Sequence, residues 1–146
     1  MEEAVLEREE EVQEIGSLHT HTNIQKNNHY KILKLVPNHA TILLEAAKCE
    51  TVKESGMIYD GVLFSAAIFA AAAAVNEPNT FLIGISMDML NPIKDSDDIT
   101  FEATANSTSS GKKNVDVLGK INDITFMQGS FILLKLDEKS LIKQKN

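Results

Sequence analysis

Residues 62–75, VLFSAAIFAAAAAV, form an uninterrupted apolar run in which Ser65 is the only polar side chain. A helix over this run is roughly 20 Å long and apolar on every side, so other parts of the chain must enclose it. A membrane-spanning helix needs about 20 apolar residues, which this run does not supply. We therefore expect no membrane contact and a buried helix in a soluble domain, capped by Asp60 and stopped by Pro78.

The composition is typical of one soluble globular domain. The chain has 146 residues, of which 43% are hydrophobic and 24% charged, with a net charge of −7 and a pI near 5.0. A chain with this negative net charge lacks the excess of basic residues that nucleic-acid binding requires, so we expect no nucleic-acid partner. The single Cys49 rules out an internal disulfide, and the glutamate-rich amino terminus is unlike a secretion signal. We therefore predict a cytoplasmic protein.

Six segments have the pattern of β-strands. Residues 99–106 alternate strictly between apolar and polar side chains, which is typical of a half-buried strand. The predicted strands are residues 30–36, 40–47, 81–90, 99–106, 114–121 and 124–136. The first two flank Pro37-Asn38 as a hairpin, and the last four have connectors short enough for an antiparallel meander.

These elements predict an α+β domain. An antiparallel sheet of five to six strands, curled round one long central helix, is an arrangement that buries such a helix. We assign residues 29–138 to this domain, residues 1–28 to an acidic amino-terminal segment and residues 139–146 to a basic carboxy-terminal tail.

Three segments, in this order, are similar to a known family. Residues 55–76 resemble its glycine-entered central helix, residues 86–99 (SMDMLNPIKDSDDI) its strand and hairpin, and residues 110–113 (SGKK) its Gly-Lys-Arg turn. On these motifs the chain resembles the hotdog-fold acyl-CoA thioesterases, particularly the small phenylacetate-pathway and hydroxybenzoyl-CoA type. The resemblance implies a hotdog fold and a thioester hydrolase with no cofactor apart from the coenzyme A of its substrate. It also implies a homodimer or homotetramer with ligand tunnels between protomers and a seam at residues 81–90.

The chain departs from the family pattern at the start of the helix. The family commonly has His-Gly-Gly there and a catalytic acid about two turns further on. In this chain those positions read Tyr59-Asp60-Gly61 and Ile68, and no carboxylate lies between Asp60 and Glu77. The acid that would act in hydrolysis therefore has to come from another position.

Four residues at this point are the candidate catalytic group. The Gly61 amide, reinforced by the helix dipole, can hold a thioester carbonyl oxygen, unless the glycine serves only close packing. Asp60 is the candidate base or nucleophile, with helix capping as its other role. Tyr59, at the family's histidine position, can donate a hydrogen bond or pack at an interface. Ser65 can orient a water or bond back to its own helix.

Candidate binding residues lie further along the chain. Lys112 and Lys113, with Lys94, are candidates for the phosphates of coenzyme A, although lysines in turns are commonly only solvated. Asn76 and Asp88 are candidates across a dimer interface, with helix termination and strand-surface polarity as their alternatives. The histidines have no partnered spacing with carboxylates or cysteines, so we expect no metal.

The first functional interpretation is an enzyme that hydrolyses acyl-CoA or acyl-carrier-protein thioesters. The alternative is a non-catalytic acyl-CoA-binding hotdog protein, acting as a sensor or accessory module. A DNA-binding sensor is disfavoured because residues 1–28 are too few and too acidic for a DNA-binding domain. A dehydratase ranks last, because it needs a catalytic histidine in the cleft and none follows His39.

Overall fold

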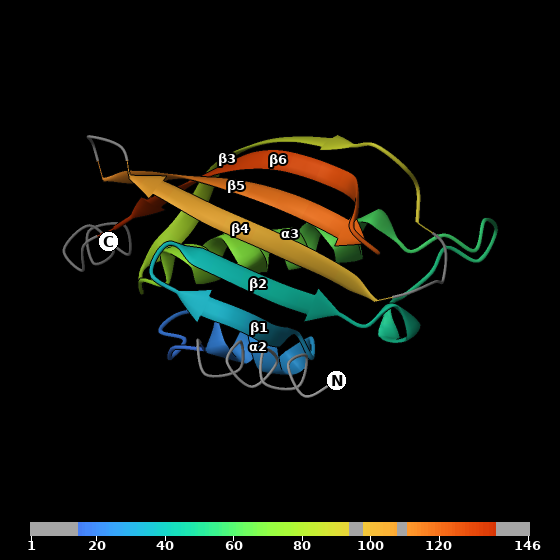
Figure 1. Ribbon diagram of the computed structural model, residues 1–146, viewed down its shortest axis with the longest axis horizontal. Helices are drawn as coiled ribbons and strands as arrows, with labels where there is room; N and C mark the ends of the chain where they lie inside the picture. The colour runs from blue at the N-terminus through green and yellow to red at the C-terminus, as the bar shows by residue number, and fades with distance from the viewer. Residues whose placement is uncertain (1–14, 94–97, 108–110, 137–146) are drawn as a thin grey trace, which may run out of the picture.

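The structure, a computed structural model, describes residues 15–93, 98–107 and 111–136. Figure 1 shows a hairpin, a long central helix and four further strands in chain order. The elements are α2 (Thr22–Asn27), β1 (Lys31–Val36), β2 (His39–Leu44), η1 (Ala46–Lys48), α3 (Asp60–Val75), β3 (Thr80–Met89), β4 (Ile99–Ser107), β5 (Lys112–Ile121) and β6 (Ile124–Lys135). The six predicted strands and the central helix are confirmed. The predicted basic tail lies outside the described residues, as do residues 1–14 of the acidic segment.

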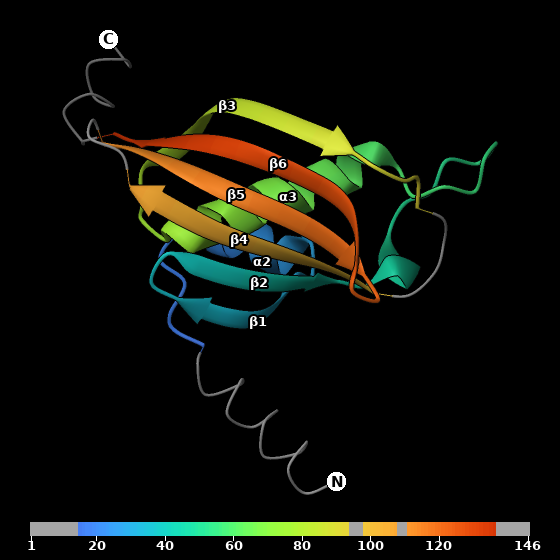
Figure 2. The same cartoon turned by 45° about the horizontal axis from the view of Figure 1, so that its top comes forward.

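The six strands form one antiparallel sheet in the order β1-β2-β4-β5-β6-β3, which curves over α3 (Figure 2). Strands β4, β5 and β6 make the expected meander. The expectation that β3 belongs to it is wrong, because β3 pairs with β6 at the far edge, with Thr80 opposite Lys135. Strand β4 pairs with β2 on one side and β5 on the other, so it has no free side for β3. Strand β3 pairs with the side of β6 that β5 does not occupy.

The ends of α3 differ from the sequence expectation. Tyr59 occupies the N-cap position in an extended conformation, and no side chain caps the helix. Asp60 is the first helical residue, where its negative charge is favourable to the helix dipole. The helix ends at Asn76, whose left-handed conformation (φ 52°) asparagine tolerates well. The cap expected at Asp60 is therefore wrong, whereas the helix does stop before Pro78, with Asn76 in the terminating role expected for it.

The carboxyl-terminal half of α3 is completely enclosed. Every residue in 69–75 is at most 9% exposed, so no side of the helix reaches solvent there. Strands β2, β4 and β5 cover one side. At the helix end, the Asn76 side-chain amide donates to the Ser17 carbonyl (2.9 Å), and its oxygen accepts from the His19 backbone N–H (2.7 Å). The expectation of an enclosed helix is confirmed for residues 69–75, where the segment before β1 closes part of the wall, but not for the first turns, where Phe64 and Ser65 are exposed.

The two edges of the sheet differ in what covers them. At β1, the Gly16 N–H donates to the Leu35 carbonyl (2.8 Å), and Ile15 forms a parallel bridge with Leu35. At β3, no described strand pairs with the outer edge. Large apolar side chains on β3 and just after it are at least 37% exposed: Phe81, Ile83, Ile85, Met89 and Leu90. An unpaired apolar edge strand of this kind is a template for pairing with another chain.

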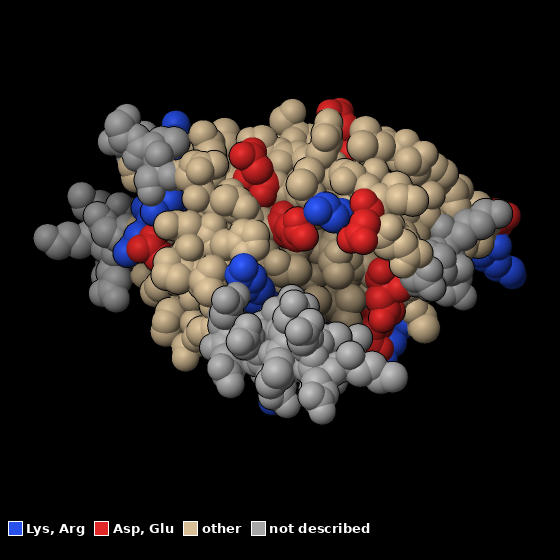
Figure 3. All heavy atoms as spheres, in the orientation of Figure 1, with Lys and Arg blue, Asp and Glu red and all other residues tan. Residues whose placement is uncertain are grey.

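The outer face of the sheet carries charges of both signs. Figure 3 shows acidic and basic side chains mixed near the middle of this face, among a majority of uncharged residues. One such pair joins Lys120 Nζ to Glu102 Oε2 at 3.0 Å. Within the described part of the chain, no helix has the length and apolar character needed to cross a membrane.

Candidate functional site

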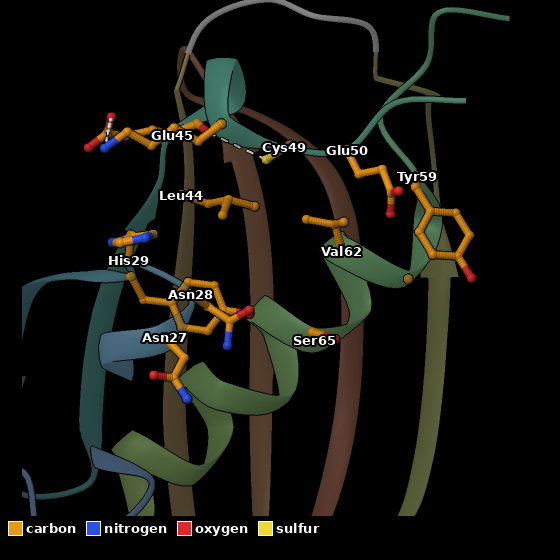
Figure 4. A pocket seen from close by; sticks show the side chains of 13 residues that line it. Asn27, Asn28, His29, Leu44, Glu45, Cys49, Glu50, Tyr59, Val62 and Ser65 are labelled. Carbon is orange, nitrogen blue, oxygen red and sulfur yellow. Dashed lines mark hydrogen bonds and ion pairs between the residues drawn. The ribbon is translucent and has the colours of Figure 1, made fainter. Parts of the chain in front are cut away.

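A cavity of about 560 Å³ opens at the amino end of α3 (Figure 4). Its walls come from the end of α2 and the residues after it, the end of β2, η1 with the two residues after it, and the first turns of α3. Figure 4 shows Leu44 and Val62 facing each other, and Glu50 beside Tyr59 on one side of α3. The lining residues are Asn27, Asn28, His29, Tyr30, Leu44, Glu45, Lys48, Cys49, Glu50, Tyr59, Gly61, Val62 and Ser65.

Tyr59 and Gly61 form a close pair at the start of α3. A Cβ atom on Gly61 would lie 2.5 Å from Tyr59 Cε2, so the missing side chain makes room for the tyrosine ring. The Tyr59 N–H donates to the Glu50 carbonyl (2.9 Å), and the Val62 N–H donates to the Tyr59 carbonyl (3.0 Å). The Gly61 N–H belongs to the first helical turn, which has no intrahelical carbonyl to bind. It is therefore a donor at the cavity wall.

Ser65 lies one turn further along α3 and lines the same cavity. It is exposed, and its hydroxyl forms no hydrogen bond with any described residue, including the carbonyls of its own helix. The back-bond considered for this serine is thus not formed. Its hydroxyl is available to a ligand.

The carboxylates near the cavity differ from the sequence expectation. Asp60 is exposed at the start of α3 and is not among the lining residues, whereas Glu50 is. The Glu50 carboxylate forms no hydrogen bond or ion pair with a described residue. Sequence spacing alone does not distinguish Glu50 from Glu54 in the same loop. It is the bond from Tyr59 to the Glu50 backbone that brings this residue beside the helix end.

The second lining carboxylate, Glu45, is held by two lysines. Its Oε1 lies 2.8 Å from Lys31 Nζ, and its Oε2 lies 3.3 Å from Lys48 Nζ. Hydrogen bonds from these two ammonium groups lower the pKa of Glu45, and the bond to Glu45 raises the pKa of Lys31. Glu45 therefore remains charged and paired near neutral pH. Lys48 places a cation in the cavity wall that the sequence did not single out.

The predicted phosphate-binding lysines lie elsewhere in the chain. Lys112 and Lys113 start β5, where Lys113 is opposite Ser107 at the end of β4. This end of the sheet adjoins the carboxyl end of α3, since Ala105 donates to Asn38 and Asn38 lines a hollow with Asn76. Within one chain these lysines are therefore distant from the cavity. Lys94 lies outside the described residues.

Two other candidates also lie away from the cavity. Asn76 ends α3 and holds the segment before β1. Asp88 lies on the outer face of the sheet, in a shallow hollow with Ser86, Asp116 and Gln128. Among the described residues, no three histidine, cysteine or acidic side chains gather as metal ligands would. The cavity at the start of α3 is thus the place where most of the predicted catalytic group meets.

Solved structures share this architecture. A point variant of the HP0420 homologue from Helicobacter felis superposes with a TM-score of 0.77 and 27% identity, covering 87% of this chain and 89% of that one. A point variant of the phenylacetic acid degradation protein PaaI from Thermus thermophilus gives 0.70 and 18%, covering 78% and 99%. The smu.793 protein of Streptococcus mutans, solved with acetyl CoA bound, gives 0.61 and 14%, covering 72% and 86%. The chain has the hotdog fold.

Sequence comparisons add little to this assignment. No family model matches the chain. A methylthioribose-1-phosphate isomerase from Aquifex aeolicus is 32% identical over 98 residues, which are 67% of this chain and 22% of the isomerase. Because the chain spans only about a fifth of that enzyme, the isomerase activity does not carry over to it.

Proposed function

We propose that the protein binds acyl thioesters of coenzyme A or an acyl carrier protein at the start of α3 and hydrolyses them. The observation that carries this proposal is the cavity in which the first-turn amide of Gly61, the free Ser65 hydroxyl and the Glu50 carboxylate meet. Support also comes from the hotdog fold and from a fold neighbour solved with acetyl CoA.

In the proposed reaction, the thioester carbonyl oxygen accepts a hydrogen bond from the Gly61 N–H. A carboxylate, either Asp60 or Glu50, takes a proton from water as the water oxygen attacks the carbonyl carbon. The helix dipole and the amide stabilise the tetrahedral oxyanion. When the C–S bond breaks, the departing sulfur takes the proton from the carboxyl group. The products are a free acid and a thiol. Ser65 orients the water, and the Tyr59 hydroxyl donates to the substrate.

The proposal includes a second copy of this chain. The unpaired β3 edge and its exposed apolar side chains are suited to antiparallel pairing with the same edge of a partner, giving a homodimer and, by further association, a homotetramer. Because Lys112 and Lys113 are distant from the cavity within one protomer, they reach bound phosphates only if the partner supplies them. Lys48 lines the cavity in the same chain and is a further candidate for these phosphates.

A panel of short, aromatic and long acyl-CoAs tests the function. Thiol release and thermal stabilisation are followed together on the purified protein, so that turnover and binding are measured separately. Turnover above the uncatalysed rate for at least one thioester is the expected result. A panel that gives neither turnover nor stabilisation would refute the proposal.

A non-catalytic acyl-CoA-binding protein is the second candidate. The observation that favours it is the composition of α3, which carries no carboxylate after Asp60 and has the half-buried Ile68 two turns in. For this function the same panel gives thermal stabilisation with no turnover above background, and substitution of Asp60 changes neither result.

A further inference from the structure

Tyr30 is held rigidly in the wall of the cavity. Its ring packs against Phe69 of α3, with the ring centroids 4.9 Å apart and the planes tilted by 35°. Its backbone N–H donates to the Gln25 carbonyl (3.1 Å), and the Gln25 side-chain amide donates to the Tyr30 carbonyl (3.2 Å). Only 4% of the residue is exposed. Helix α2 therefore fixes the position of this tyrosine from one side and α3 from the other.

The Tyr30 hydroxyl has no hydrogen-bond partner among the described residues. Buried tyrosine hydroxyls usually find one, because leaving such a group unpaired is costly. Among the described residues, every side-chain nitrogen or oxygen that is completely buried has a hydrogen-bond partner. An unpaired hydroxyl such as that of Tyr30 is therefore not completely buried. The Tyr30 oxygen therefore touches the cavity that the residue lines, where a ligand oxygen or water can pair with it.

This hydroxyl is a hydrogen-bond donor near neutral pH. Burial, and secondly the charge of Cys49, raise the pKa of Tyr30 above its usual value of 10.0, so the phenol stays protonated. A protonated phenol in a fixed position suits an oxygen acceptor on a ligand. The donor is thus in place before a ligand arrives, and binding does not have to order it.

Most of the lining residues carry a polar group, although slightly more of the cavity surface is apolar than polar. Leu44 and Val62 are the only aliphatic side chains among the thirteen lining residues. Asn28 donates its amide to the Ile24 carbonyl (2.9 Å), which leaves its side-chain oxygen for the cavity. A long alkyl chain would desolvate these groups without pairing them, which is unfavourable. A negatively charged acyl group would meet the unpaired Glu50 carboxylate.

We propose that the cavity selects short, uncharged acyl groups that carry an accepting oxygen, such as a hydroxyl or keto oxygen, and that Tyr30 donates to that oxygen. This inference rests on the proposed binding of acyl thioesters. It makes Tyr30 a specificity-determining residue that touches the acyl group. The hydrolytic step itself does not require Tyr30.

Matched pairs of thioesters test the proposal on the wild-type protein. Dissociation constants are measured by calorimetry for 3-hydroxybutyryl-CoA, acetoacetyl-CoA, butyryl-CoA and decanoyl-CoA. The two oxygenated ligands should bind roughly tenfold tighter than butyryl-CoA, which is the effect expected of one good hydrogen bond. Butyryl-CoA or decanoyl-CoA binding as tightly as 3-hydroxybutyryl-CoA would overturn the inference and leave the proposed function intact. If none of the four binds, this inference is wrong, and the proposed function is then decided by the wider panel that includes aromatic acyl-CoAs.

The variant Tyr30→Phe isolates the hydroxyl, because it removes one oxygen and keeps the ring on Phe69. The preference for 3-hydroxybutyryl-CoA over butyryl-CoA should fall below about twofold. The control Thr100→Val removes a hydroxyl from the outer face of the sheet and should leave the preference intact. A Tyr30→Phe protein that keeps the tenfold preference would refute the assignment. Melting temperatures check folding, and the wild-type comparison stands even if the variant is unstable.

Discussion

Enlarging the alanines of α3 tests how tightly this helix is enclosed. Ala71 and Ala73 are both 0% exposed, and because successive helical residues turn by about 100°, they lie on nearly opposite sides of the helix. Ala71→Leu and Ala73→Leu each add three carbon atoms where no open surface remains. Overpacking of this kind costs about 1–3 kcal/mol per site. In a domain of this size, that lowers the melting temperature by about 4–12 °C.

The assay is thermal unfolding at one fixed protein concentration, since association also shifts the midpoint. The control is Ala47→Leu in η1, the same chemical change at an exposed alanine, which should alter stability by less than about 0.5 kcal/mol. Wild-type stability in both α3 variants would refute the reasoning that residues 69–75 of α3 are packed on all sides. A loss in only one of them would show that a single side of the helix is tightly packed.

Three further outcomes are expected. Light scattering should give the mass of a dimer, twice 16.1 kDa, and Ile85→Lys on β3 should give monomers; a stable wild-type monomer would contradict the edge pairing. Asp60→Asn and Glu50→Gln should separate the two candidate bases, because only the variant that loses the true base should bind the ligand without turning it over. Full activity in both variants would exclude both carboxylates as the base. Burial lowers the pKa of His21 below 6.5 in the folded protein, so the unfolded chain takes up this proton more readily. The free energy of unfolding therefore decreases as the pH falls below 6.5. The stability difference between wild type and His21→Asn, which tolerates the left-handed backbone, should shrink from pH 7.5 to 5.5; a constant difference would contradict this.

The fold was predictable because its determinants are local patterns. The apolar run at residues 62–75 and the alternation in residues 99–106 identified the helix and the strands to within a few residues. The position of β3 was not predictable in this way, because a meander and the observed order bury the same faces. The pairing of β4 with β2 distinguishes the observed strand order from a meander. This pairing joins segments far apart in the sequence, and no local sequence pattern indicates it.

The site was predictable only where it is local in sequence. Tyr59, Gly61 and Ser65 fall on two turns of one helix, so their meeting follows from helix geometry. Glu50 and Tyr30 reach the same cavity through tertiary contacts. Glu50 is placed by the hydrogen bond from the Tyr59 N–H to its carbonyl, and Tyr30 by the contact of its ring with Phe69. Neither contact has a signature in sequence spacing.

Helix α3 contacts β3, and its first turns also line the cavity. Ser65 lines the cavity. The preceding residue Phe64 lies about 100° around the helix and is exposed, and Ile85 of β3 is exposed too. If a partner protomer packs against Phe64, it orders the same turn that presents Ser65 and Gly61 to a ligand. Ligand binding and dimerisation then strengthen each other by the same factor. A saturating acyl-CoA should therefore lower the dissociation constant of the dimer, and an unchanged constant would show that the two surfaces of α3 act independently.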